Sequence, residues 1–312
     1  MIQKNIKDHI YGFNRAFNFG LGQPSFFSIR GFPKSGTNWL SNLMNLHPAV
    51  FSSGEWGFTH LAEAREHILK IAGWSVLNGP YMQGHLDADF ESMIAKLMIK
   101  HASSKCSFRR IKYLGDKTPG FAYPPVIKKS KCLYIVRDVR DVTVSRAYHL
   151  LRVNRRYVLN RFPVMSKKQE EYGGNLQYFK DHPGQLLDDL DWVRDTTQEW
   201  VKHIGQVLEA KNNGFAECFP DYEVKIVHYE KLHANVKAER DDCYRFLGLE
   251  PNKALPLDSG PVKTSPGFSS EDPQKFYRKG VVGDWNNYFS EAVENVVLEE
   301  AGSILKKLKY IK

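Results

Sequence analysis

The sequence predicts a single α/β domain with a central, mainly parallel β-sheet that is flanked by helices on both faces. Two observations predict this fold class. Short β-rich runs alternate with segments of helical spacing, which is the pattern of parallel strands joined by crossover helices. In addition, 42% of the 312 residues are hydrophobic, which is enough to build a large core. The domain is expected to span the whole chain, 1–312.

The first elements lie close to the start of the chain. Residues 25–32 form a β-rich run, Pro33 and Gly36 break it, and residues 38–46 have helical spacing with Ser35 or Thr37 as the N-cap. The alternation then repeats, and the sequence predicts strands at 111–115, 131–136 and 224–228 and helices at 138–153, 235–247 and 291–309. Segments 61–71 and 187–211 also have helical character. We expect strand 111–115 to lead directly into a loop.

Two segments are expected to lie outside the regular structure. Residues 1–24 are predicted to be an N-terminal extension. Charged residues interrupt the apolar ones in this part of the chain, so we expect neither a signal peptide nor a membrane span of about 20 residues there. Residues 250–277 are rich in proline and are predicted to form a mobile loop or lid.

Net charge and cysteine content narrow the class of ligand and the compartment. The 44 Lys and Arg residues against 35 Asp and Glu give a net charge of +9, which favours anionic ligands such as phosphate, sulfate, nucleic acid or an acidic polymer. The four cysteines are scattered and form no CxxC pair, which predicts reduced thiols in the cytoplasm. Because the sequence contains no HxxH or HExxH motif, we expect no metal.

The turn after the first strand has the composition of an anion-binding loop. Lys34, Ser35, Gly36 and Thr37 place main-chain N–H groups, two hydroxyls and one ammonium at the N-terminus of the next helix. Unpaired N–H donors and the helix dipole favour phosphoryl or sulfuryl oxygens at such a point. The segment is not a Walker A loop, because GxxxxGK[ST] is absent and the lysine precedes the glycine. An ordinary turn with an exposed lysine is the alternative.

Two further cationic segments accompany this loop. Arg137 follows strand 131–136 at the carboxyl edge, where open α/β sheets bind ligands, and Ser145 lies eight residues later in the next helix. Arg278 and Lys279 precede Gly280, which lets a backbone approach a ligand closely. Taken singly, such segments are more often solvated turns or salt-bridged cations than ligand sites.

Together, the three segments resemble the signatures of the PAPS-dependent sulfotransferase family. PKSGTNW at 33–39 resembles its 5′-phosphosulfate-binding loop, VRDVRDVTVS at 136–145 is similar to its 3′-phosphate-binding strand and helix, and RKGVVGDW at 278–285 resembles its RKGxxGDW signature. The resemblance implies a P-loop-like domain that transfers a sulfuryl group from 3′-phosphoadenosine 5′-phosphosulfate (PAPS) to an acceptor hydroxyl. The implied product is adenosine 3′,5′-bisphosphate (PAP), and the family's chemistry needs no metal.

The same resemblance assigns roles to individual residues. It implies that Lys34 holds the 5′ end and the bridging oxygen, that Trp39 stacks on the adenine, and that Tyr229 approaches the adenine. An aromatic that merely ends a strand is the alternative for Tyr229. The residues implied to cradle the 5′-phosphate are Ser35, Gly36, Thr37 and Asn38. Those implied to clamp the 3′-phosphate are Arg137, Ser145, Arg278, Lys279 and Gly280.

The general base is expected in the segment GDKTP. Cytosolic small-molecule enzymes of the family carry their catalytic histidine in a KTH segment, whereas GDKTP resembles the EKS or (E/D)KTP motif of carbohydrate-type and many bacterial members. This likeness makes Asp116 the base and Lys117 the residue that orients it or neutralises sulfuryl charge. A structural ion pair between Asp116 and Lys117 is the alternative. The rival bases are His60, His85 and His149.

The acceptor is predicted less sharply than the donor. GDKTP favours a carbohydrate or glycolipid hydroxyl over a small phenol or alcohol. Arg152, Arg155 and Arg156 have helical spacing and either bind an anionic acceptor or form a solvated cationic face. Two other classes of function stay open, a nucleotide-dependent kinase and a non-catalytic module that binds a polyanion. We expect no nucleic-acid partner and no transmembrane segment, and the sequence leaves a homo-oligomer open.

Overall fold

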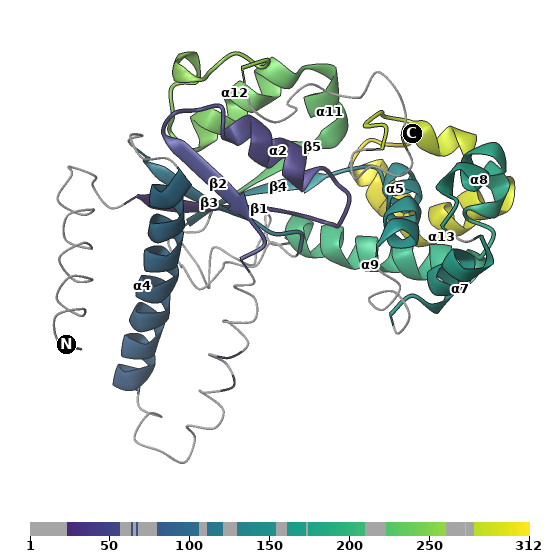
Figure 1. The fold of residues 1–312 in the computed structure, drawn as a ribbon, viewed down its shortest axis with the longest axis horizontal. Coiled ribbons are helices and arrows are strands. Elements are labelled where there is room, and N and C mark those ends of the chain that lie inside the picture. Colours follow the sequence, from purple (N-terminus) through teal and green to yellow (C-terminus); the bar gives the residue numbers. More distant parts are fainter. Residues whose placement is uncertain are drawn as a thin grey trace.

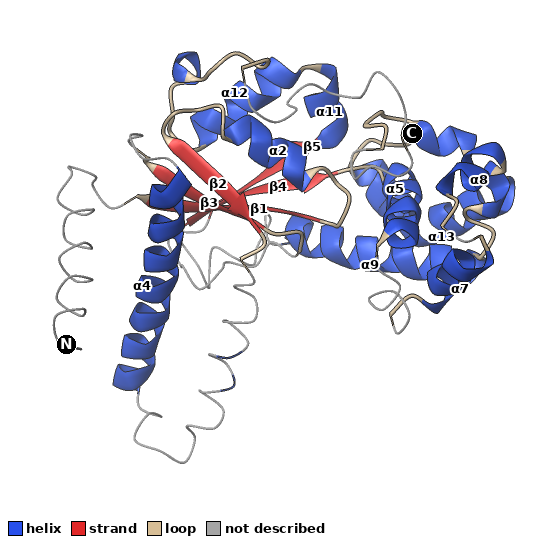
Figure 2. Cartoon of the chain, viewed as in Figure 1, coloured by secondary structure: helices blue, strands red, loops and turns tan. Residues whose placement is uncertain are grey.

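A five-stranded parallel sheet forms the centre of the protein (Figure 2). The structure, a computed structural model, describes residues 24–56, 64, 67, 80–105, 111–120, 130–153, 161–172, 174–209, 223–259, 272 and 278–312. The strands are β1 (Ser25–Gly31), β2 (Val50–Gly54), β3 (Tyr113–Lys117), β4 (Ser130–Val136) and β5 (Glu223–His228). Their order is β2-β3-β1-β4-β5, and every neighbouring pair is parallel. The predicted fold class is therefore confirmed.

Helices cover both faces of this sheet (Figure 1). One face carries α2 (Thr37–Met44), α11 (Tyr229–Ala234) and α12 (Val236–Phe246). The other is covered by α5 (Val139–Arg152) and α9 (Leu190–Glu209), with α13 (Glu291–Lys307) packed against them. The remaining described elements are α4 (Pro80–Lys105), α7 (Pro163–Glu171), α8 (Leu176–Asp181) and the short turns η3 (Pro183–Gln185), η5 (Pro251–Lys253) and η6 (Asp284–Asn287).

Strand β4 shows why the sequence folds in this way. Its side chains alternate between the two faces, so that Leu133 and Ile135 join the core under α2 while Tyr134 and Val136 join the core under α5. All four are completely buried. A strand that is buried on both faces reads as a continuous apolar run, and its polar residues are confined to its ends. Arg137 follows directly, at the carboxyl edge of the sheet.

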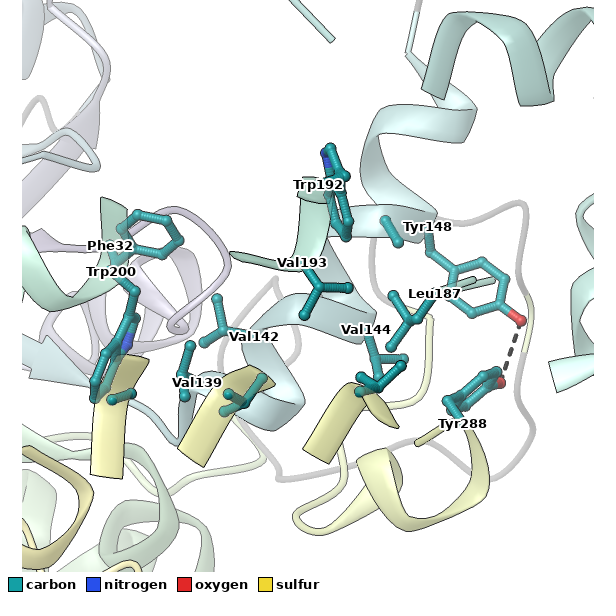
Figure 3. Packing of buried hydrophobic residues seen from close by; sticks show 14 of the residues in the cluster. Phe32, Val139, Val142, Val144, Tyr148, Leu187, Trp192, Val193, Trp200 and Tyr288 are labelled. Carbon is teal, nitrogen blue, oxygen red and sulfur yellow. Dashed lines mark hydrogen bonds between the residues drawn. The ribbon is translucent and has the colours of Figure 1, made fainter. Parts of the chain in front are cut away.

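The core between α5 and α9 also fixes the surroundings of that edge (Figure 3). Trp200 of α9 is completely buried, and its indole N–H donates to the main-chain carbonyl of Arg137 at 3.2 Å. Further along α5, the hydroxyls of Tyr148 and Tyr288 lie 3.2 Å apart. These contacts attach the end of β4 and the segment before α13 to one helical layer.

The observed elements differ from the predicted ones in a few places. The strand expected at 111–115 lies at Tyr113–Lys117, so Asp116 and Lys117 belong to the strand and not to a following loop. The sequence did not predict β2, α4, α7, α8 or α11. The N-terminal extension except its last residue, most of the helix expected at 61–71, and residues 260–271 and 273–277 of the expected lid lie outside the described residues.

Candidate active site

The loop between β1 and α2 has the backbone of an anion-binding turn. Lys34 and Gly36 both have positive φ, 75° and 102°, and Gly36 is the residue that caps α2. A Cβ atom on Gly36 would lie 2.7 Å from Cδ2 of the Tyr229 ring, so the position requires glycine. Ser35 is completely buried, and its hydroxyl oxygen makes no hydrogen bond. The first N–H groups of α2 have no partner within the helix. The loop therefore presents donors to an anion.

The ammonium of Lys34 lies in a strongly cationic environment. Burial and the positive charges of Arg152 and Arg137 lower the pKa of Lys34 to about 7. Because neighbouring cations disfavour the charged form of Lys34, an anion that binds beside it offsets their repulsion and interacts favourably with the ammonium. A bound anion would therefore raise the pKa of Lys34 again.

Arg137 connects this loop with the segment near the C-terminus. Its Nη1 donates to the carbonyl of Lys34 at 3.3 Å, and its Nη2 donates to the carbonyl of Val281 at 2.9 Å. The guanidinium carbon lies 4.2 Å from the centre of the Tyr229 ring. Three of the predicted donor-site segments thus meet at one side chain. Ser145, also predicted, lies further along α5 and is half-buried.

The segment 278–285 is attached to α5 by Asp141 and is held together internally by Asp284. Asp141 of α5 accepts hydrogen bonds from the main-chain N–H groups of Gly283, at 2.8 Å, and Trp285, at 3.1 Å. Asp284 accepts a hydrogen bond from Arg278 and another from Lys279, the latter at 2.6 Å. Burial opposes the ionisation of Asp284, but these two cations lower its pKa below the usual range. The predicted cations are therefore present as an ordered pair.

An aromatic cluster lies beside the loop. The rings of Trp39 and Tyr229 are 5.4 Å apart in an edge-to-face arrangement, so the two residues expected to contact adenine are neighbours. His233 completes the cluster, with its ring 6.1 Å from Tyr229 and its Nε2 3.0 Å from the carbonyl of Gly280. His233 was not predicted, because a lone histidine in a short helix carries no motif.

Asp116 and Lys117 do not pair with each other, because successive residues of β3 point to opposite faces of the sheet. Asp116 instead forms a buried ion pair with Arg30, whose Nη2 lies 2.5 Å from Oδ2, and its Oδ1 accepts from the Thr118 hydroxyl at 2.8 Å. The expected contact by which Lys117 would orient Asp116 is not formed in this structure, and the role of Lys117 in neutralising sulfuryl charge stays a prediction. Both carboxylate oxygens of Asp116 already have partners in the protein.

Lys117 pairs with a residue that the sequence did not single out. Its ammonium lies 3.1 Å from Oε1 of Glu55, which follows the end of β2. Glu55 has a positive φ of 54°, and its side chain is 64% exposed while that of Lys117 is only 10% exposed. Of these two carboxylates, Glu55 is therefore the exposed one and Asp116 the buried one. Recognition of β2 would have been needed to find Glu55 from the sequence.

The three histidines considered as alternative bases lie in different environments. The ring of His149 accepts a hydrogen bond from Arg152 at 3.0 Å, and burial together with the charges of Lys34, Arg152 and Arg146 lowers its pKa to about 4. His85 is exposed on α4, and His60 lies outside the described residues, as do Arg155 and Arg156.

The described part of the chain has neither a metal-binding cluster nor a helix that could span a membrane. Among those residues, no three His, Cys, Asp or Glu side chains are arranged to hold a metal ion. None of the described helices combines the length and apolar character that a membrane crossing requires.

Comparison with known proteins gives a consistent set of relatives. Sulfotransferase 1E1 of the mouse is 23% identical over 290 residues, which cover 88% of this chain and 81% of that protein. Sulfotransferase 6B1 of the zebrafish is 29% identical over 180 residues, covering 53% of this chain and 48% of that protein. The crystal structure of mouse sulfotransferase SULT7A1 complexed with PAP has a TM-score of 0.46 and 17% identity, and the match covers 92% of this chain and 89% of that chain.

The family comparison is decisive, because it covers most of the chain. The sulfotransferase domain family matches residues 25–308, from the first residue of β1 to the residue after the end of α13. The kinase and the non-catalytic polyanion binder therefore lose their support. The chain belongs to the sulfotransferase family and is an enzyme that transfers a sulfuryl group from PAPS to an acceptor hydroxyl.

Proposed function

We propose that the donor binds across the contact between the β1–α2 loop, Arg137 and the segment 278–281. One observation carries this proposal: Arg137 donates to the carbonyl of Lys34 and to the carbonyl of Val281, so all three signature segments share one side chain. The 5′-phosphate is assigned to the donors of Ser35, Gly36, Thr37 and Asn38. The 3′-phosphate is assigned to Arg137, Ser145, Arg278, Lys279 and Gly280. Trp39 and Tyr229 are assigned to the adenine, since their rings adjoin the loop.

Lys34 is assigned the principal catalytic role. In sulfuryl transfer the acceptor oxygen attacks sulfur in line, the bond to the bridging phosphate oxygen breaks, and negative charge develops on that oxygen. A cation already positioned there stabilises the charge without reorganisation of solvent. Lys34 is suited to this because the loop fixes its backbone through Arg137 and its ammonium is largely buried.

Two carboxylates compete for the role of general base, Asp116 and Glu55. The motif favours Asp116. The geometry favours Glu55, because its exposed carboxylate contacts a single side chain of the described residues, that of Lys117, whereas Asp116 is enclosed by Arg30 and Thr118. In either case the base takes the proton of the acceptor hydroxyl as the oxygen–sulfur bond forms. Lys117, beside Glu55, is assigned to orient that carboxylate or to neutralise sulfuryl charge.

The family acts on small-molecule acceptors. For this enzyme we propose a carbohydrate or glycolipid hydroxyl, which rests on the GDKTP motif, with a small phenol or alcohol as the alternative. We expect the enzyme to act in the cytoplasm, a proposal supported by Cys132 and Cys243, which are buried free thiols. A homo-oligomer is compatible with these assignments.

Calorimetric titration with PAP, AMP and ATP tests the donor assignment. We expect micromolar binding of PAP and at least about tenfold weaker binding of AMP, which lacks the 3′-phosphate. Arg278→Ala should weaken PAP binding strongly and leave AMP binding unchanged, whereas the exposed Arg245→Ala should change neither. Equal affinity of the wild type for PAP and AMP would contradict the assignment of these residues to the 3′-phosphate.

Proton uptake on binding tests the environment of Lys34. With a pKa of about 7, Lys34 is about nine-tenths neutral at pH 8, and a bound phosphate should restore a pKa near its ordinary value. PAP binding should therefore take up nearly one proton at pH 8 and very little at pH 6, where Lys34 is already charged. Calorimetry in buffers of different ionisation enthalpy measures this uptake. The difference in proton uptake between the wild type and Lys34→Ala isolates the contribution of Lys34. Equal uptake by both proteins would show that Lys34 does not gain a proton when PAP binds.

A further inference from the structure

The peptide group between Arg137 and Asp138 is held from both sides. Its carbonyl oxygen accepts from the indole N–H of the buried Trp200 at 3.2 Å, and its N–H donates to Oε1 of Glu230 at 2.9 Å. Arg137 is assigned to the 3′-phosphate, and the direction of a side chain depends on the backbone from which it extends. Trp200 and Glu230 therefore fix the position from which the guanidinium reaches the ligand.

Glu230 is a buried carboxylate that depends on donors at both of its oxygens. Burial raises its pKa, and hydrogen bonds from the Asp138 N–H and from the Tyr310 hydroxyl oppose that rise. A buried charge is stable where hydrogen bonds replace the water that it has lost. The neighbouring Tyr229 places its ring 4.2 Å from the guanidinium carbon of Arg137. These two consecutive residues thus support Arg137 at its backbone and at its side chain.

The second donor to Glu230 comes from the residues after α13. The hydroxyl of Tyr310 donates to Oε2 of Glu230 at 2.7 Å, and the main-chain carbonyl of Tyr310 accepts from Nη2 of Arg140 at 3.3 Å. Burial and the charge of Glu230 raise the pKa of Tyr310, so the hydroxyl keeps the proton that it donates. Tyr310 lies two residues beyond the stretch 25–308 that matches the sulfotransferase domain family, so that match does not include it.

The turn that brings Tyr310 to this place has a strained backbone. The N–H of Tyr310 donates to the carbonyl of Leu305 at 2.8 Å. That of Lys309 donates to the carbonyl of Lys306 at 3.0 Å, which completes the hydrogen-bond pattern of a Schellman cap. Such a cap needs one left-handed residue, usually glycine, but here Lys309 adopts this conformation with a φ of 64°. A strained turn of this kind persists where the surrounding contacts hold it, and the contacts of Tyr310 do so.

We propose that Tyr310 is a positioning residue for the 3′-phosphate site, acting through Glu230 on the peptide group before α5 and thereby on Arg137. The inference rests on the proposed function, because it takes the ligand of Arg137 from it. Tyr310 itself is assigned no contact with the nucleotide, so loss of its hydroxyl leaves every assigned donor ligand in place. Binding of PAP should therefore depend on Tyr310, whereas binding of AMP, which lacks the 3′-phosphate, should not.

The test compares three variants by calorimetry with PAP and AMP. Tyr310→Phe removes the hydroxyl and keeps the ring. Tyr178→Phe is the matched control, because it deletes a half-buried hydroxyl of α8 that donates to Gln185 at 2.7 Å, outside the site. Glu230→Gln removes a negative charge but keeps an acceptor for the Asp138 N–H and an amide that can donate to the Tyr310 oxygen.

The affinity of Tyr310→Phe for PAP should fall by roughly three- to tenfold, while its affinity for AMP should change by less than about twofold. Glu230→Gln should keep the PAP-to-AMP affinity ratio or raise it, because a lost negative charge favours an anion nearby. Protonation of Glu230 in Tyr310→Phe would likewise raise the ratio. The sign of the change therefore separates loss of position from change of charge, and Tyr178→Phe should match the wild type.

An unchanged or larger PAP-to-AMP ratio in Tyr310→Phe overturns the inference, and so does an equal loss of affinity for both nucleotides. If the wild type does not prefer PAP over AMP, the donor assignment fails instead. Hydrogen exchange of the nucleotide-free protein, followed by NMR, then decides about Tyr310. The Asp138 amide and the Trp200 indole should exchange at least about tenfold faster in Tyr310→Phe and at the wild-type rate in Tyr178→Phe. Equal exchange in all three proteins would refute the positioning role.

Discussion

Lys34→Ala is expected to lower kcat by roughly 10²- to 10³-fold, which is the usual loss when one preorganised group that stabilises developing charge is removed. The effect should fall on kcat because the ammonium interacts most strongly with the bridging oxygen when its bond to sulfur breaks. Affinity for PAP should fall by about tenfold or less, because Arg137, Arg278 and the main-chain donors of the loop remain. Single-turnover measurements with PAPS and calorimetry with PAP provide the two quantities.

A matched control is Lys237→Ala, since this lysine of α12 has a side chain that is 74% exposed and, among the described residues, pairs with Asp241 alone. It should behave like the wild type in both assays. A Lys34→Ala enzyme with a near-normal kcat would exclude Lys34 from the chemical step. A variant that loses PAP binding altogether would instead make Lys34 a residue for binding and not for catalysis.

The part of the site that the sequence could predict consists of segments with local signatures. The loop at 33–37 is marked by Pro33 and Gly36, and the structure shows why glycine is needed, because Tyr229 leaves no room for a Cβ atom. Strand β4 is marked by its unbroken apolar run, and Arg137 follows from the end of that run. The contact of Arg137 with both other segments links residues 34 and 281, and no local pattern shows it.

The part that could not be predicted depends on strand pairing. Asp and Lys are rare in strands, so propensity places Asp116 and Lys117 in a loop. Pairing with Ser28 and Ile29 of β1 and with the end of β2 overrides this preference and keeps both residues in β3. Strand β2 itself has only Val50 and Phe51 before two serines and a glycine, so it has little strand character of its own. Glu55 was missed for the same reason.

The two candidate bases are expected to separate in a pair of variants. Glu55→Gln should lower kcat by roughly 10²- to 10⁴-fold, because loss of a general base costs that much, while the affinity for PAP and the melting temperature stay unchanged. Asp116→Asn should act on folding instead. It breaks a buried ion pair and leaves Arg30 without its counter-charge, which costs about 3–5 kcal/mol of the free energy of unfolding. Denaturant unfolding and steady-state kinetics on both variants measure the two effects.

The opposite pattern would restore the assignment that the motif suggests. If Asp116→Asn keeps the stability of the wild type and loses turnover while Glu55→Gln stays active, Asp116 is the base and its pair with Arg30 must open during the reaction.

A third variant, Arg30→Lys, distinguishes these two cases further. A lysine at position 30 keeps the positive charge next to Asp116, so it should preserve most of the stability. If Asp116 is the base, the shorter lysine cannot reproduce the two-atom contact of Arg30 with the Asp116 carboxylate and its main-chain carbonyl, and kcat should change as well. If Glu55 is the base, Arg30→Lys should again preserve most of the stability and should leave kcat unchanged.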